Sequence, residues 1–401
     1  MQKKEGLMGK SRVYVCHTYY HVYVACLKEL NRTGEEKQGP VTLVLSTMSN
    51  DFGNLNERAL SSGIFDEVVW FEEKPYDFFE ELIPLKKDTG SLVLNMIHRM
   101  KFCRRLGQLE EAYVPVDFAS YDEIYVFCDS DPIGYYLSYK KIRYHAVEDG
   151  LNCIRYRDTA YSDNEGHFGL KKWMARKGWI FIQNGYGKYC IDMEVNDISA
   201  LDHPIDKMVE VPRQKLVDGL DMAAKEKLIS LFIENRNDLD EALSCATKKG
   251  KPVVLILTEP LCKDLSVRRK LVEDMIREYG MFSEEECGRK RGKISSSPEE
   301  NRKMEQGVIV IKPHPRDLLD YKAIFPQYIV LDAKFPMEIL NFFQKGDKPI
   351  FDRVVTVYTV PSSIHCAREK VYLGNAFMDR YEDAASHASV TDHGESQLRS
   401  K

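Results

Sequence analysis

The sequence predicts an α/β protein of two domains, each built on an open and largely parallel sheet. The chain has 401 residues, which is more than one hydrophobic core usually serves. Short apolar runs alternate with helical stretches, the pattern of a parallel sheet with helices on both faces. The alternation is interrupted by a charged helical stretch over residues 211–249 and then restarts. We therefore expect domains at residues 1–245 and 246–380, followed by a polar tail at 381–401.

The first domain is expected to begin with a strand over residues 12–16, a polar turn over 17–21 (HTYYH) and a helix to residue 30. No Gly-x-Gly-x-x-Gly follows this strand, which argues against an NAD or FAD domain. A basic helix is expected around residues 96–106. Four more strands are expected at 41–46, 67–71, 121–128 and 141–147.

In the second domain, strands are expected at residues 252–257, 308–311, 328–331 and 353–357. A long helix should follow the first of them and end near residue 279. Residues 283–306 are polar and charged, and we expect an exposed insertion there. Ser362 and Ser363 are expected to open a further helix.

Composition narrows the class of protein. The formal net charge of −5 argues against a nucleic-acid partner, because such proteins usually carry a basic excess. The ten cysteines lack CxxC or paired His spacings, which favours buried reduced thiols over disulfides or zinc. The apolar part of the N-terminus is too short for a membrane span, so we expect a cytoplasmic protein. The basic run at residues 98–105 suggests peripheral contact with anionic lipid, contact with an anionic acceptor glycan, or simply a solvated helix face.

The turn Lys312-Pro313-His314-Pro315-Arg316 is the first candidate functional feature. Two prolines hold the imidazole of His314 in a stiff turn at a strand end. The three donor side chains suit a phosphate leaving group, which His314 could hydrogen-bond or protonate. The alternative is a surface turn with a solvated histidine.

Ser362 and Ser363 follow another strand of the same domain. Hydroxyls and N–H groups at a helix start form an anion site, although simple helix capping would use the same residues. Glu338 lies at a further helix start and could accept hydrogen bonds from two ribose hydroxyls, or complement the helix dipole.

Glu148, Asp149 and Gly150 end the last strand expected in the first domain. Ligands of open α/β sheets bind beyond the carboxyl ends of strands. A carboxylate at this position could accept a proton from an attacking hydroxyl. The alternative is an ordinary acidic loop.

Together these motifs resemble those of bacterial sialyltransferases, which share D/E-D/E-G, HP and S/T-S/T motifs in this order. The turn at residues 258–261 and the string at 311–317 are most similar to glycosyltransferase family 52, whose members often have Gln where this chain has Glu259. The resemblance covers residues 11–378, including the opening turn at 17–21. In this chain the three motifs read Glu148-Asp149-Gly150, His314-Pro315 and Ser362-Ser363.

The resemblance implies a GT-B-like fold, with two Rossmann-like domains facing a central cleft. It implies inverting transfer from CMP-sialic acid, with no metal and no cofactor. Asp149 would be the general base and His314 would assist the departing phosphate. Ser362 and Ser363 would hold that phosphate, and Glu338 the ribose. The expected substrate-binding set also includes Glu148, Gly150, Thr258, Lys312, Pro315 and Arg316.

Asp129-Ser130-Asp131 formally matches a metal-binding DxD loop, but it follows a strand of the first domain, so we interpret it as a turn or acceptor-side element. The expected acceptor is a galactose-ended glycan of a bacterial lipooligosaccharide or capsule. The alternatives are a GT-B transferase or epimerase with a different nucleotide sugar, and a non-catalytic nucleotide-sugar-binding homologue. The resemblance also allows a homodimer.

Overall fold

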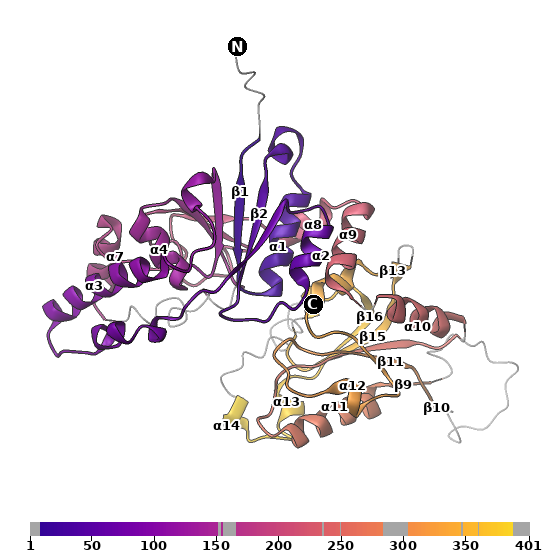
Figure 1. The fold of residues 1–401 in the computed structure, drawn as a ribbon. Coiled ribbons are helices and arrows are strands. Elements are labelled where there is room, and N and C mark those ends of the chain that lie inside the picture. Colours follow the sequence, from indigo (N-terminus) through magenta and orange to yellow (C-terminus); the bar gives the residue numbers. More distant parts are fainter. Residues whose placement is uncertain are drawn as a thin grey trace, which may run out of the picture. The chain divides into compact units, whose positions relative to one another are not determined.

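The computed structural model describes residues 9–150, 154, 166–234, 236–248, 250–283, 304–345, 348–359 and 361–387. The chain divides into two compact units, residues 1–231 and 232–401, and each contains its own parallel sheet (Figure 1). The expected α/β class is therefore confirmed. Helix α10 (Arg236–Lys248), which we expected to close the first domain, belongs to the second unit.

The first unit contains a seven-stranded sheet of order β3-β2-β1-β4-β5-β6-β7, in which every pairing is parallel. The sequence predicted the first three strands residue for residue, and placed the next two within a few residues. The strands are β1 (Arg12–Cys16), β2 (Val41–Ser46), β3 (Glu67–Phe71), β4 (Glu123–Phe127), β5 (Tyr144–Val147), β6 (Cys190–Val195) and β7 (Met208–Glu210).

Strands β6 and β7 were not expected from the sequence. Strand β6 contains two acidic side chains, and its pattern is not a plain apolar run. The structure provides partners for both: Asp192 meets His145 Nδ1 at 2.7 Å, and Glu194 accepts from Lys28 Nζ. These partners come from distant parts of the chain, so a local pattern could not reveal them.

Helices cover the sheet of the first unit. Helix α4 (Pro132–Lys140) packs on the sheet through Ile133 and Leu137. A second apolar cluster contains Phe102 of α3 and Met174 of α7. The helices are α1 (Tyr19–Leu30), α2 (Leu55–Ser61), α3 (Leu92–Glu110), α4 (Pro132–Lys140), α7 (Phe168–Lys177), α8 (Arg213–Asp218) and α9 (Met222–Phe232), with 3₁₀ turns η1 (Gly34–Gln38), η2 (Tyr76–Phe78), η3 (Glu80–Lys86) and η4 (Phe118–Ser120).

The second unit contains a five-stranded parallel sheet of order β12-β11-β8-β15-β16. Its strands are β8 (Val253–Leu257), β11 (Val308–Lys312), β12 (Ile329–Val330), β15 (Phe351–Thr356) and β16 (Ala367–Tyr372). Two short antiparallel pairs add β9 (Met281–Ser283) to β10 (Met304–Gln306), and β13 (Gln344–Lys345) to β14 (Lys348–Pro349). The expected insertion lies largely outside the described residues, and its two ends form the β9–β10 pair.

Helices α11 (Leu265–Tyr279) and α13 (Gly374–Met378), labelled in Figure 1, belong to the second unit. Both helices share one apolar cluster with this sheet. Buried strands such as β8 and β11 carry continuous apolar runs, as expected of parallel strands covered on both faces. The remaining elements are α12 (Tyr321–Ile324), α14 (Ala384–His387), η6 (Met337–Phe342) and η7 (Pro361–Ser363).

The prediction that a helix begins at Ser362 and Ser363 is wrong. These residues lie in the single 3₁₀ turn η7, and the chain then enters β16. Strand β16 pairs with β15 from Phe351↔Ala367 onward. The unpaired edge of β15 therefore recruits a segment whose local sequence also suited a helix.

Seven cysteines whose side chains the structure describes are free thiols, and all of these except Cys128 are buried. In that same part, no helix is both long enough and apolar enough to cross a membrane.

Candidate active site

Five ionisable side chains form a histidine–carboxylate cluster in the first unit: His17, His21, Glu73, Asp131 and Asp149. His17 follows β1, Glu73 follows β3, and Asp149 follows β5. Parallel strands end at the same edge of a sheet, so the fold brings these residues together where α/β proteins bind ligands. Thr18 caps α1, with its hydroxyl accepting from the His21 N–H at 3.2 Å, and this starts the helix next to the edge.

Glu73 fixes His17 within this cluster. The imidazole Nε2 of His17 lies 2.7 Å from Glu73 Oε2, and both side chains are buried. Glu73 also accepts from Ser46 Oγ at 2.6 Å and from the Ile133 N–H at 2.8 Å. Burial would lower the pKa of His17, but the carboxylates of Glu73, Asp131 and Asp149 together outweigh it and raise the pKa to about 9. His17 is therefore an imidazolium at neutral pH.

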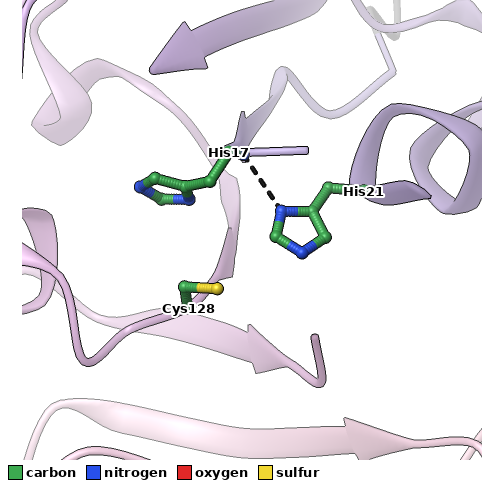
Figure 2. Close-up of side chains that lie close together, drawn as sticks. All are labelled: His17, His21 and Cys128. Carbon is green, nitrogen blue, oxygen red and sulfur yellow. Dashed lines mark hydrogen bonds between the residues drawn. The ribbon is translucent and has the colours of Figure 1, made fainter. Parts of the chain in front are cut away.

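Asp149 is held by His21. The His21 Nε2 contacts Asp149 Oδ1, and the His17 N–H donates to His21 Nδ1 at 3.0 Å (Figure 2). Burial lowers the pKa of His21 more than Asp149 raises it, so His21 is neutral. Burial would raise the pKa of Asp149, but the hydrogen bonds from His21 and Cys128 and the positive charge of His17 prevail and lower it. Asp149 is thus an ionised carboxylate, and its side chain is 32% exposed.

The other two residues of the acidic motif do not resemble Asp149. The Glu148 side chain is 1% exposed, and burial raises its pKa. Its Oε2 has no hydrogen-bond partner among the described residues. Gly150 has φ of 105°, a conformation that side chains rarely adopt and that glycine tolerates. Asp149 is therefore the carboxylate of this motif that a substrate can reach.

The formal DxD loop separates its two carboxylates. Asp129 is buried and accepts from Tyr144 Oη at 2.9 Å and from the Asn184 N–H at 2.8 Å. Asp131 precedes α4 and lies 3.3 Å from His17 Nε2. Each carboxylate thus has a role within the fold, consistent with a turn element.

His17, His21 and Cys128 also present metal-ligand atoms within 4.8 Å of one another (Figure 2). His21 Nδ1 already accepts a backbone N–H, so a metal on its Nε2 would require an imidazolate. Ligating histidines normally donate, rather than accept, at the second nitrogen. This donor set does not suit a metal ion as it stands.

In the second unit, Thr258 organises the turn that follows β11. The Thr258 N–H donates to Lys312 O at 3.1 Å, and its hydroxyl accepts from the His314 N–H at 3.1 Å. His314 Nδ1 accepts from the Arg316 N–H at 3.1 Å, which leaves the proton of the neutral ring on Nε2. Burial, then Arg316 and Lys312, lower the pKa of His314 to about 4. His314 is therefore a neutral Nε2–H donor.

Lys312 is a buried cation beside this turn. It is 4% exposed and donates to Pro313 O at 2.7 Å and Ala333 O at 3.0 Å. Burial lowers its pKa to about 7, although Asp332 and Glu338 oppose the shift. Burial conversely raises the pKa of Glu338, and Lys312 opposes that shift. Lys312 and Glu338 thus influence each other electrostatically, while Pro315 and Arg316 are exposed.

Asn341, which the sequence did not single out, fixes the turn that contains the serine pair. Its Nδ2 donates to Ser363 O at 2.9 Å, and its Oδ1 accepts from the N–H groups of His365 and Cys366 at 2.8 and 3.1 Å. The N–H groups of His365 and Cys366 are therefore occupied and do not serve as donors to an anion.

Glu259 and Asp317 are two further organising residues. Glu259 accepts from the Tyr358 N–H at 2.9 Å and from Thr359 Oγ1 at 2.7 Å, which fixes the loop before η7. Asp317 accepts from Tyr321 Oη at 2.7 Å. Both lie in segments the sequence had singled out, at 258–261 and 311–317. The partners of Glu259 are distant in sequence, whereas Tyr321 lies one helical turn after Asp317.

Comparisons with known proteins match this chain to one family and show low similarity to several solved structures. The profile of Glycosyltransferase family 52 matches residues 87–364. An uncharacterized protein of Haemophilus influenzae is 36% identical over 69 residues, which are 17% of this chain and 21% of that protein. The chain therefore spans about a fifth of the curated relative that it matches.

Three solved structures are similar at low identity. A calicheamicin glycosyltransferase has 10% identity and a TM-score of 0.40, with 97% of this chain and 91% of that chain covered. The UDP-GlcNAc 2-epimerase of Neisseria meningitidis has 9% identity and a TM-score of 0.38, with 86% of this chain and 76% of that chain covered. The ADP-heptose lps heptosyltransferase II of E. coli has 11% identity and a TM-score of 0.28, with 90% of this chain and 89% of that chain covered.

Proposed function

Because the chain belongs to glycosyltransferase family 52, we propose that it transfers sialic acid from CMP-sialic acid to a galactose-ended glycan. The acceptor would belong to a bacterial lipooligosaccharide or capsule. We further propose that the reaction inverts the anomeric carbon and uses no metal. The observation that carries the proposal is Asp149, an ionised and accessible carboxylate at the end of β5.

Asp149 acts on the acceptor in this proposal. An acceptor hydroxyl attacks the anomeric carbon of sialic acid, its proton passes to Asp149, and the bond from that carbon to the CMP phosphate oxygen breaks. The electron pair of that bond leaves with CMP. A carboxylate held ionised is ready to accept the proton without a prior titration step.

The turn after β11 acts on the donor. The Nε2–H of His314 donates to the phosphate, and exposed Arg316 adds a positive charge. Lys312 gains charge as the phosphate arrives, because an anion opposes the effect of burial on its pKa. Preorganised donors of this kind stabilise charge that develops on a leaving group.

The remaining residues of the expected set complete the donor side. Glu338 accepts from ribose hydroxyls, and the hydroxyls of Ser362 and Ser363 bind the phosphate. Thr258 positions His314 through the 3.1 Å hydrogen bond to its N–H. On the acceptor side, Gly150 provides the turn that follows Asp149. Glu148 also belongs to the expected substrate-binding set, and its side chain is buried.

Two titrations and one incubation test this function. CMP should bind and UDP should not; binding of UDP alone would contradict the donor assignment and favour another nucleotide sugar. Incubation with CMP-Neu5Ac and a panel of galactosides should then yield a sialylated product by mass spectrometry. Binding of CMP-Neu5Ac without any product would indicate a non-catalytic homologue instead.

A further inference from the structure

We propose that His21 is a positioning residue that keeps Asp149 ionised and oriented, and that it takes no part in carrying the proton away. This inference rests on the proposed function, in which Asp149 is the base. It assigns His21 a function that the sequence motifs did not indicate.

The hydrogen bonds of His21 determine its tautomer. The His17 N–H can only donate, so His21 Nδ1 must offer a lone pair at their 3.0 Å separation. The single proton of the neutral ring then lies on Nε2, which contacts Asp149 Oδ1. Figure 2 shows the hydrogen bond from the His17 N–H to His21 Nδ1. His21 is therefore a fixed donor to this carboxylate.

The same hydrogen bonds prevent His21 from acting as a relay. To accept a proton from Asp149, the ring would have to be protonated on Nδ1 as well. That proton would meet the N–H of His17, and two donors cannot bond to each other. The cation would also be buried, which opposes charge. The proton therefore remains on Asp149 until it leaves to solvent or product.

Packing holds the His21 ring in place. The side chain is buried and stacks on Phe127, with ring centroids 4.6 Å apart and an interplanar angle of 12°. His21 cannot reach a substrate, whereas Asp149 is partly exposed. The exposed group performs the chemistry and the buried group orients it.

Other groups also affect the charge on Asp149. Cys128 donates a hydrogen bond to Asp149 and lowers its pKa, as does the positive charge of His17. Asp131 and Glu148 interact with Asp149 as like charges. The largest lowering contribution is the hydrogen bond from His21, so His21 is the residue whose removal should be most visible in a pH profile.

The test compares His21→Leu, which removes the donor, with His21→Gln, whose amide retains one. In His21→Leu we expect kcat/KM to fall about tenfold to a hundredfold, because a hydrogen bond to a charged group is lost. The acidic limb of its pH–rate profile should move up by about one pH unit. His21→Gln should restore most of the rate and return the limb towards its original position. A purely structural role would lower the rate without moving the limb.

His145 provides a matched control in the same unit. It pairs with Asp192 at 2.7 Å rather than with Asp149, so His145→Leu removes a similar interaction from another carboxylate. Its pH profile should keep the wild-type limb. A shift of the limb in His145→Leu, or none in His21→Leu, would contradict the inference.

A measurement without substrate separates this inference from the proposed function. In ¹⁵N NMR of histidine-labelled protein, His21 should show the Nε2–H tautomer and should titrate below the ordinary histidine range, because burial lowers its pKa. An Nδ1–H tautomer, or titration in that range, would overturn the inference even in an active enzyme. If the tautomer is as stated but no sialyl transfer occurs, the proposed function is wrong instead.

Discussion

Arg268 donates to Asp317 at 2.7 Å, and both side chains are almost completely buried, at 7% and 0% exposure. Arg268 lies on α11, and its other nitrogens donate to the carbonyl oxygens of Leu261 and Cys262. Asp317 in turn accepts from Thr258 Oγ1 at 3.2 Å. This pair therefore joins the loop after β8 to the turn that carries His314.

We expect Arg268→Met to destabilise the second unit and to weaken CMP binding. Removing one partner of a buried ion pair leaves the carboxylate of Asp317 uncompensated, which typically costs about 3–5 kcal/mol. The His314 turn also loses a contact that fixes it. A lower Tm in thermal unfolding and a higher Kd for CMP in calorimetry would show the two effects.

Arg269→Met is the control for this prediction. Arg269 neighbours Arg268 on α11 but forms an exposed pair with Glu273, with side chains 55% and 42% exposed. Exposed pairs contribute little to stability, so Tm and the Kd for CMP should stay at wild-type values. Equal losses in the two variants would show that helix α11 is sensitive to any change of charge.

Asp149→Asn should abolish most of the transfer activity while CMP binding stays unchanged. Loss of a positioned general base lowers kcat/KM by ~10²–10⁴-fold. Asn can still accept a hydrogen bond from His21, so the fold should persist. Steady-state kinetics with CMP titration measures both quantities, and a variant with wild-type kcat/KM would exclude Asp149 as the base.

The pH dependence linked to Asp149 has a definite sign. Its pKa lies below the ordinary value of 3.8. The carboxylate therefore contributes stability that is present above about pH 4, the unfolded range, and is lost as pH falls through the lower folded pKa. Acid unfolding of Asp149→Asn, followed by circular dichroism, should lack the loss of stability that the wild type shows below about pH 4, as this carboxylate is protonated.

His314 should remain a neutral donor when CMP binds at mildly acidic pH. Its Nδ1 accepts from the Arg316 N–H at 3.1 Å, so a second ring proton would meet that donor, and its pKa in the free protein is about 4. At about pH 5.5 Lys312, with a pKa of about 7, is already protonated. Calorimetry in two buffers of different ionisation enthalpy should therefore give the same proton linkage for the wild type and for His314→Gln, and a proton uptake that His314→Gln removes would contradict this tautomer.

Lys312→Met should leave the free protein at least as stable at pH 7, while CMP affinity falls by about tenfold or more. Burial lowers the pKa of Lys312 from 10.5 to about 7. The unfolded chain binds the extra proton between these values, so wild-type stability falls from pH 10.5 towards 7. The variant lacks this loss, and its advantage in Tm should grow as pH decreases. The exposed Lys322 provides the control, since Lys322→Met should follow the wild type at every pH.

The sequence was sufficient to predict the α/β class, the parallel strands and the order of the candidate motifs. Strands β1, β2 and β3 are continuous apolar or β-branched runs, and such patterns are local. The sequence was less informative where the outcome depends on a distant partner. Residues 362–370 could have begun a helix, but pairing with β15 made them a turn and a strand.

The amino-acid sequence by itself determined that Glu148 and Asp149 follow a strand, and that His314 stands between two prolines. Only the tertiary structure decided that Glu148 is buried while Asp149 is accessible, and that His21 donates to Asp149. The physical reason is that strand ends and turn residues follow local propensity, whereas burial, tautomer and charge state depend on side chains brought in from elsewhere in the chain.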